Sequence, residues 1–87
     1  MYSVYVIQHN KTKELYFGKT SCLFDRLLRH NDNSKKYTKR KSGKWILIYV
    51  ESFRNKKDAD FRELALKKHG NGKRWLKNRI RNSMLQN

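Results

Sequence analysis

The chain of 87 residues is sized for one domain with one modest core, because a chain this short buries only roughly 60% of the surface that its unfolded form exposes. Apolar residues make up 37% of the sequence and aromatic residues 13%, which excludes a disordered polycation. The 22 Lys and Arg against 7 Asp and Glu give a net charge of +15, and this excess predicts a polyanionic partner, with nucleic acid favoured over an acidic membrane surface.

The sequence offers no segment for membrane insertion. Its longest apolar run, residues 45–50, is far shorter than the ~20 residues that span a bilayer, and residues 1–10 lack the pattern of a signal peptide. Cys22 is the single cysteine and has no Cys or His neighbour at the spacing of a zinc site. We therefore expect a cytoplasmic protein in a reducing compartment, with no membrane partner.

The first expected element is a β-hairpin. Residues 2–8 are rich in Val, Ile and Tyr, residues 10–13 are polar, and residues 15–18 are apolar again. The register of such a hairpin can bring Tyr5 and Tyr16 to the same face of the sheet.

A helix is expected next, up to about residue 31. Ser21 is suited to its N-cap, and apolar residues recur at helical spacing after it. Arg26 and His30 are one turn apart and therefore share the flank of this helix.

Residues 31–44 are polar and basic, which predicts a loop, and residues 45–53 form an unbroken β-branched and aromatic run. Such a run is typical of a strand covered on both faces. We therefore expect residues 45–53 to be an interior strand of a small sheet.

Two helices are expected after this strand. The first extends from Asn55 to Gly70, between an N-cap and a C-terminal glycine. It has apolar residues on two sides, so we expect it to be packed between two layers, with Glu63 beside a packed face. The second, residues 73 to about 84, is expected to close the core with Trp75, Leu76 and Ile80, and residues 70–72 are expected to be the turn between them.

The motifs, taken in this order, resemble those of the GIY-YIG nuclease superfamily. "SVY" at 3–5 and "YFG" at 16–18 are followed by Arg26, ten residues beyond Tyr16, and by Glu63 on a later helix. "LIYVESF" at 47–53 and "GKRWLK" at 72–77 are similar to segments of its short, single-domain bacterial members. The chain also resembles the catalytic domain of the excision-repair incision nuclease. The likeness covers nearly the whole chain, although Ser3 stands in place of the first Gly and Phe17 in place of the Ile.

The resemblance implies an α+β fold, with a small three-stranded antiparallel sheet flanked by about three helices in a single domain, residues 1–87. It also implies a hydrolase: a DNA endonuclease that uses Mg²⁺ or Mn²⁺. Carried over residue by residue, the catalytic positions are Tyr5, Tyr16, Lys19, Arg26, His30 and Glu63. Either Asn71 or Asn78 is in range of a late asparagine position of the family.

The chemistry of phosphodiester hydrolysis explains these residue types. Glu63 can hold a divalent ion that otherwise keeps waters and binds the substrate phosphate. Arg26 can clamp that phosphate through its planar fork of donors. Each residue also has a structural interpretation: Glu63, for example, can pair with Lys67 at i, i+4.

The remaining groups would handle the attacking water. Tyr16 is a candidate base or water-orienting group, supported by Tyr5. A tyrosine needs a nearby cation, such as Lys19 or the metal, to lower its pKa from about 10. His30 could hold the water or relay a proton.

The basic loop predicts contacts with DNA phosphates, which carry no sequence information. The candidate DNA-binding residues are Lys35, Lys36, Tyr37, Lys39, Arg40, Lys41 and Lys44. We expect selectivity for DNA structure, or specificity supplied by a protein partner, in repair or recombination in the bacterial cytoplasm at the nucleoid. RNA stays an alternative substrate. We expect the oligomeric state to be a monomer or a weak dimer. The alternative function is a nucleic-acid-binding module, or a partner-activated subunit, with little activity of its own.

Overall fold

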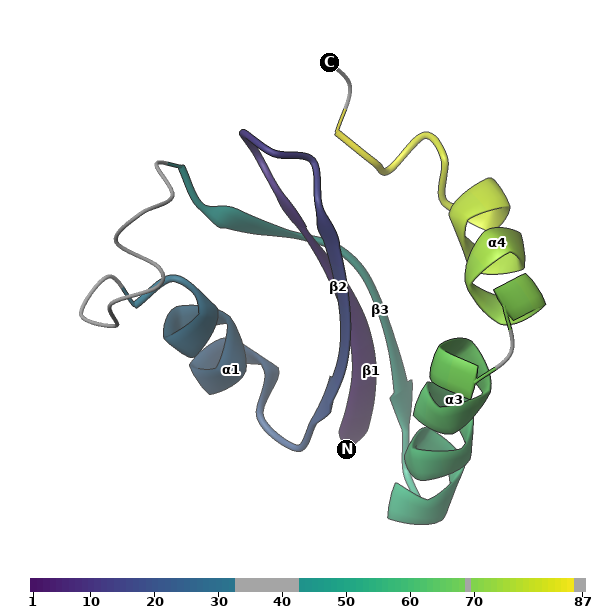
Figure 1. Cartoon of the computed structure of the whole chain (residues 1–87). Helices are drawn as coiled ribbons and strands as arrows, with labels where there is room; N and C mark the ends of the chain where they lie inside the picture. Colours follow the sequence, from purple (N-terminus) through teal and green to yellow (C-terminus); the bar gives the residue numbers. More distant parts are fainter. Residues whose placement is uncertain (33–42, 69, 86–87) are drawn as a thin grey trace.

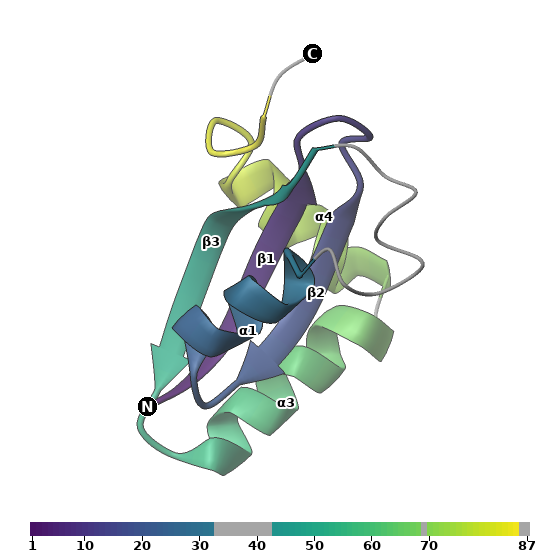
Figure 2. The same ribbon diagram turned by 90° about the vertical axis from the view of Figure 1, so that its left-hand side faces the viewer.

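The structure, a computed structural model, describes residues 1–32, 43–68 and 70–85. Its elements are β1 (Tyr2–His9), β2 (Leu15–Thr20), α1 (Leu23–His30), β3 (Trp45–Phe53), α3 (Lys56–Lys68) and α4 (Gly70–Arg79). The strands form one antiparallel sheet in the order β2-β1-β3. Helix α1 lies on one face of this sheet, and α3 and α4 lie on the other (Figures 1 and 2). The expected α+β fold is confirmed.

The central strand of the sheet is β1, and the expectation that residues 45–53 form the interior strand was wrong. Seven of the eight residues of β1 are buried, whereas β3 is an edge strand whose residues are mostly half-buried. Strand β3 has a strand neighbour on one side only, so its unbroken apolar run does not come from a central place in the sheet. The run reflects instead the packing of side chains on the faces of the strand. Burial of faces and order in the sheet are separate properties, and only the first is encoded in the local pattern.

The core lies between the sheet and the two C-terminal helices. It joins residues of the sheet to residues of α3, α4 and the turn after α4: Val4, Val6, Phe17, Ala59, Leu66, Leu76 and Ile80. This packing fixes α3 against β1 and β2, and α3 is the helix that carries Glu63.

The two C-terminal helices differ from expectation in which aromatic residues they bury. Phe61 on α3 is 68% exposed and Trp75 on α4 is 65% exposed, so α3 is packed on one side only and Trp75 does not close the core. Gly70 begins α4 instead of ending the preceding helix, and α4 ends at Arg79, before the expected residue 84. Leu76 and Ile80 are buried as predicted. Within the described ranges, none of the helices is long and apolar enough to cross a bilayer.

Candidate active site

Two tyrosines share the sheet face that α1 covers. Tyr5 of β1 is paired with Gly18 of β2, and Ile7 with Tyr16, so the two tyrosines are diagonal neighbours on adjacent strands. Their ring centroids are 6.3 Å apart. The prediction that the hairpin brings them to one face is confirmed.

Gly18 makes room for both rings. A Cβ atom at this position would lie 2.5 Å from Cζ and from the hydroxyl oxygen of Tyr5, and 2.9 Å from Cε1 of Tyr16. Real Cβ atoms essentially never come so close to other atoms. The glycine of "YFG" is therefore required by packing: it allows the Tyr5 ring to lie across β2.

His30 completes a cluster with the two tyrosines. The hydroxyl oxygen of Tyr5 lies 2.9 Å from Nε2 of His30, within hydrogen-bond distance. The ring of His30 is also 4.7 Å from that of Tyr16, centroid to centroid. The last turn of α1 thus brings the histidine onto the hairpin face.

The surroundings keep Tyr5 and His30 in their neutral forms. Burial, followed by the nearby Tyr16, raises the pKa of Tyr5 to about 12, although the Arg26 guanidinium opposes this shift. Burial, followed by the positive charge of Arg26, lowers the pKa of His30. At neutral pH the bond between them therefore joins a phenol to an uncharged imidazole, and such an imidazole can accept a proton.

The ends of α1 are held by side chains that the sequence did not single out. Cys22 is the N-cap, with no side-chain hydrogen bond, in place of the expected Ser21. Thr20 shapes the turn before it: its hydroxyl accepts from the Cys22 N–H at 3.0 Å and donates to the Cys22 carbonyl at 3.1 Å. At the other end, the Asn31 amide donates to the Trp45 carbonyl and accepts from the Trp45 N–H, at 3.1 and 2.7 Å. Asn31 therefore fixes the helix end, next to His30, to β3.

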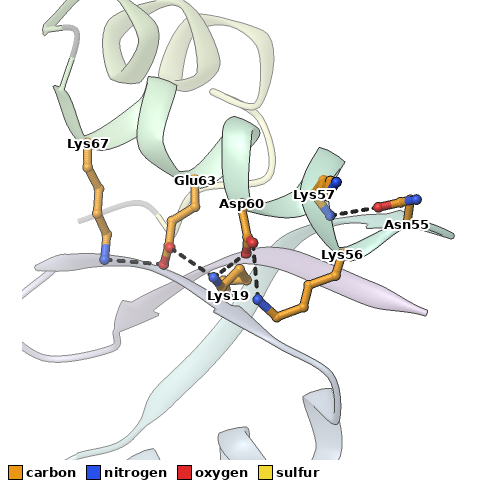
Figure 3. A network of polar contacts seen from close by, with 7 residues as sticks. All are labelled: Lys19, Asn55, Lys56, Lys57, Asp60, Glu63 and Lys67. Carbon is orange, nitrogen blue, oxygen red and sulfur yellow. Dashed lines mark hydrogen bonds and ion pairs between the residues drawn. The ribbon is translucent and has the colours of Figure 1, made fainter.

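A second group of charged side chains lies between α3 and β2. The Lys19 ammonium contacts the Asp60 carboxylate and lies 3.7 Å from Oε1 of Glu63 (Figure 3). Lys56 and Lys67 approach the same two carboxylates, at 3.1 Å from Asp60 and 3.3 Å from Glu63. Ion pairing with Lys19, then with Lys56, lowers the pKa of Asp60. Asp60 was not among the residues predicted from the sequence, although its place one turn before Glu63 on the same helix was a usable signal.

The two groups approach the sheet from opposite faces (Figures 1 and 2). Glu63 comes from the α3 face and the tyrosines belong to the α1 face, yet the Glu63 charge makes a small contribution to the raised pKa of Tyr5, after burial and Tyr16. Lys19 is turned toward the carboxylates of α3, and the pKa of Tyr5 is raised, not lowered. Lys19 is therefore placed to hold carboxylates or phosphate, and its predicted effect on the candidate base Tyr16 stays a prediction.

The donor set around Glu63 fits a hard divalent ion held loosely. The described residues contain no group of three or more His, Cys, Asp and Glu side chains that could enclose a metal. Mg²⁺, however, is often bound by one or two carboxylates together with waters and substrate phosphate. Glu63 and Asp60 offer two carboxylates one turn apart, both facing the same ammonium group. A small hard cation therefore suits this position, with phosphate supplying further ligands.

Several predicted residues cannot be placed in the site. Lys35, Lys36, Tyr37, Lys39, Arg40 and Lys41 lie outside the described residues. Lys44 is exposed just before β3, and its backbone N–H donates to the Asn10 side chain at 2.9 Å. Asn71 and Asn78 are both exposed on α4, so the late asparagine position stays open between them.

A scan of protein families gave one match that covers most of the chain. A family model described as the GIY-YIG catalytic domain matches residues 1–79. A search of curated proteins and a search of solved structures each returned no match.

Proposed function

Because the chain belongs to the GIY-YIG family, whose catalytic domain has a nuclease-type fold, we propose that it is a metal-dependent endonuclease that hydrolyses phosphodiester bonds in DNA. Its proposed site comprises Tyr5, Tyr16, Lys19, Arg26, His30 and Glu63. The observation that carries the proposal is the cluster of Tyr5, Tyr16 and His30 on one face of the sheet, with the hydroxyl of Tyr5 2.9 Å from Nε2 of His30.

Arg26 and Lys19 would bind the phosphate. The guanidinium of Arg26 lies close enough to Tyr5 and His30 to influence both of their pKa values. A phosphate held in its fork of donors would therefore be next to the Tyr5–His30 hydrogen bond. The positive charge would also stabilise the negative charge that develops on the phosphate oxygens during reaction.

His30 and Tyr16 would handle the attacking water. A neutral imidazole can accept the proton of that water, and the lowered pKa of His30 keeps the ring neutral at neutral pH. Tyr16 is 39% exposed, so its ring is open to substrate at the edge strand β2. Its hydroxyl would orient the water or act as the base, and Tyr5 would hold His30 in place.

Glu63 would hold the divalent ion, with Asp60 beside it. When bound, such an ion neutralises phosphate charge and lowers the pKa of a bound water. In its absence, Lys19 and Lys67 balance the charge of Glu63 at 3.7 and 3.3 Å. Both distances are longer than a close ion pair, which leaves the Glu63 oxygens available to a competing cation.

The substrate would be recognised by charge and shape. A net charge of +15 on 87 residues favours any polyanion, and phosphate contacts carry no base sequence. We therefore propose selectivity for branched, flapped or nicked DNA, with repair or recombination as the setting and a protein partner as a second source of specificity.

The second candidate is a nucleic-acid-binding module with the same fold. It is favoured by one observation: Glu63 is already paired with Lys67 at i, i+4 and with Lys19, as a purely structural carboxylate would be. Basic charge explains DNA binding equally well in both cases. A metal requirement separates them, because only the nuclease uses one.

Cleavage of labelled DNA tests the proposal. Duplex, single-stranded, flap and four-way-junction DNA would be incubated with the protein and Mg²⁺ or Mn²⁺, together with folded Glu63→Gln and Arg26→Ala variants. Asp58→Asn is the matched control, because Asp58 is an exposed carboxylate in the first turn of the same helix. We expect metal-dependent cuts by the wild type and the control, and none by the other two variants.

A different outcome of the same experiment would support the nucleic-acid-binding module. The wild type would bind these DNAs without cutting any of them, and Glu63→Gln would bind as tightly or more tightly without metal, since it lacks a negative charge near the phosphate.

A further inference from the structure

A small cavity lies beside the proposed site, where the end of β2, the start of α1 and the start of α3 come together. Its volume is about 230 Å³, and its lining residues are Tyr2, Lys19, Thr20, Ser21, Arg26 and Lys56. Two of these, Lys19 and Arg26, belong to the proposed catalytic residues. The other four have no role in the mechanism described above.

The described lining residues include cations but no anion. Three basic residues from three different elements line the cavity, and no carboxylate is among the described residues that do so. The nearest counter-charge comes from Asp60, which bonds both Lys19 and Lys56 (Figure 3). Lys19 also lies 3.7 Å from Glu63, so two carboxylates stand against three lining cations, and the remaining positive charge favours an anionic ligand.

Lys56 is free to change partners. Its side chain is 62% exposed, and its 3.1 Å contact with Asp60 is an i, i+4 pair on the helix surface. Exposed pairs of this kind are worth only about 0–1 kcal/mol. Lys56 can therefore turn from Asp60 to an anion in the cavity at little cost, while Asp60 stays bonded to Lys19.

The size and the walls of the cavity fit a phosphate group. Clefts for drug-sized ligands measure roughly 300–1,000 Å³, so this smaller space suits one charged group and part of a sugar. Tyr2 is a half-buried aromatic lining residue, and Ser21 is an exposed one. The hydroxyl of Thr20 is used within the turn that shapes the rim.

We propose that this cavity binds the backbone phosphate adjacent to the one that is cut, and that Lys56 is the residue dedicated to it. This inference rests on the proposed function, because it assumes that the protein cuts the neighbouring phosphodiester. Arg26 and Lys19, which border both places, would contact neighbouring phosphates of one strand. Lys56 would then fix the register of the strand across the site, as a positioning residue outside the chemistry.

Phosphate binding can be tested without any cleavage. Inorganic phosphate and dimethyl phosphate would be titrated into the isotope-labelled protein, with the backbone amide signals of Thr20 and Ser21 followed by NMR. Lys56→Ala is compared with Lys57→Ala, which removes the same charge from the next position of the same helix. Lys57 is not among the described residues that line the cavity, and the contact drawn for it in Figure 3 is the one from its backbone N–H to the Asn55 side chain.

We expect saturable shifts at Thr20 and Ser21 in the wild type and in Lys57→Ala, and at least a several-fold weaker response in Lys56→Ala. Equal weakening by the two variants, or shifts spread over surface lysines without saturation at this turn, would overturn the proposal.

DNA with single neutral linkages then tests which phosphate is bound. A methylphosphonate placed at each position in turn removes one charge, and binding is measured with the Glu63→Gln protein so that no cutting interferes. We expect a methylphosphonate at one position to weaken binding by the Glu63→Gln protein and by the Glu63→Gln/Lys57→Ala double variant. The same methylphosphonate should have little further effect on binding by the Glu63→Gln/Lys56→Ala double variant, because the effects of coupled partners are not additive. Lys56→Ala should also reduce the salt slope of binding by about one.

The position of the coupled phosphate separates the two proposals. In a cutting protein, coupling next to the cleaved bond supports the inference, and coupling only to a terminal 5′-phosphate, or to no position, contradicts it. If the protein never cuts but one internal position still couples to Lys56, the phosphate site stands and the proposed nuclease function fails.

Discussion

Gly18 is the residue on which the geometry of the tyrosines depends most. Any side chain there meets the ring of Tyr5 at 2.5 Å and that of Tyr16 at 2.9 Å. The Tyr5 ring cannot move far, because Tyr5 is 1% exposed and its hydroxyl is within hydrogen-bond distance of His30. A single methyl group at position 18 would therefore disturb both the packing of the sheet face and the arrangement of the candidate active site.

Gly18→Ala is therefore expected to lower the free energy of unfolding by about 1–3 kcal/mol, the usual cost of overpacking. It should also lower DNA cleavage roughly 100-fold, because small displacements of catalytic groups have large effects. Urea unfolding and single-turnover cleavage measure the two. Gly70→Ala is the control: nothing lies within 4 Å of its Cβ, so stability should stay the same or rise. Wild-type cleavage by Gly18→Ala would contradict the arrangement of the tyrosines described here.

His30 should make stability depend on pH in a defined direction. Its pKa is lowered, first by burial and then by Arg26, so between this lowered value and the ordinary value of about 6.5 the unfolded chain binds more protons than the folded one. Stability should therefore be full above about pH 6.5 and fall as the pH decreases through the lowered pKa.

Urea unfolding at a series of pH values, for the wild type and for His30→Asn, measures this component. His9 and His69 are present in both proteins, so the difference between the two curves reports on His30. We expect the flatter curve for His30→Asn. Parallel curves would mean that His30 titrates in the folded protein as it does in the unfolded chain.

At the scale of elements, α3 connects the core to the site. Its inner side buries Ala59 and Leu66, with Glu63 half-buried toward β2, while its outer side leaves Phe61 exposed. The ion pair between Arg62 and Glu51, at 2.6 Å, fastens the same helix to β3. The position of Glu63 therefore depends on packing that is independent of the chemistry.

Leu66→Ala should destabilise the protein by about 2–5 kcal/mol, because it leaves a cavity at a residue that is 1% exposed. Phe61→Ala, on the outer side of the same helix, should change the free energy of unfolding by no more than about 0.5 kcal/mol. Thermal or urea unfolding of both variants decides which side of α3 is the core. Equal destabilisation would restore the two-sided packing that the sequence predicted.

The site could be predicted from sequence where the pattern is local. Strand alternation places Tyr5 and Tyr16 on one face, and the i, i+4 spacing brings His30 to the same flank as Arg26. Asp60 was missed because one more carboxylate on a charged helix is unremarkable until Lys19 is seen to bond it. Contacts between elements that are distant in the chain decide such roles.

The fold could be predicted in its parts and less well in their arrangement. The hairpin, the first helix and the later strand follow from periodicity and turn residues, which are local signals. Strand order depends on which strand finds two partners, and the exposure of Trp75 depends on what packs against α4. Neither property is set by the residues of a single segment.

At the scale of the whole molecule, the charge acts on stability and binding in opposite ways. A net charge of +15 repels itself within a radius of gyration of 13.3 Å, and salt screens this repulsion. Added salt should therefore raise the urea midpoint of the free protein. It should weaken DNA binding, with log K falling by about 0.9 for each duplex phosphate neutralised.

Unfolding and binding measured in the same salt series test this pair of trends. Binding that does not respond to salt would mean that the basic surface is not what holds DNA.

The most direct test of the account is to locate a divalent ion on the protein, because this requires no knowledge of the preferred DNA. Mn²⁺ added in small amounts to the isotope-labelled protein broadens NMR signals near the places where it binds. We predict broadening centred on Glu63 and reaching Tyr5 and Tyr16, lost in Glu63→Gln and retained in Asp58→Asn. Broadening that is absent from these residues, or unchanged in Glu63→Gln, would contradict a metal-dependent nuclease site in this protein.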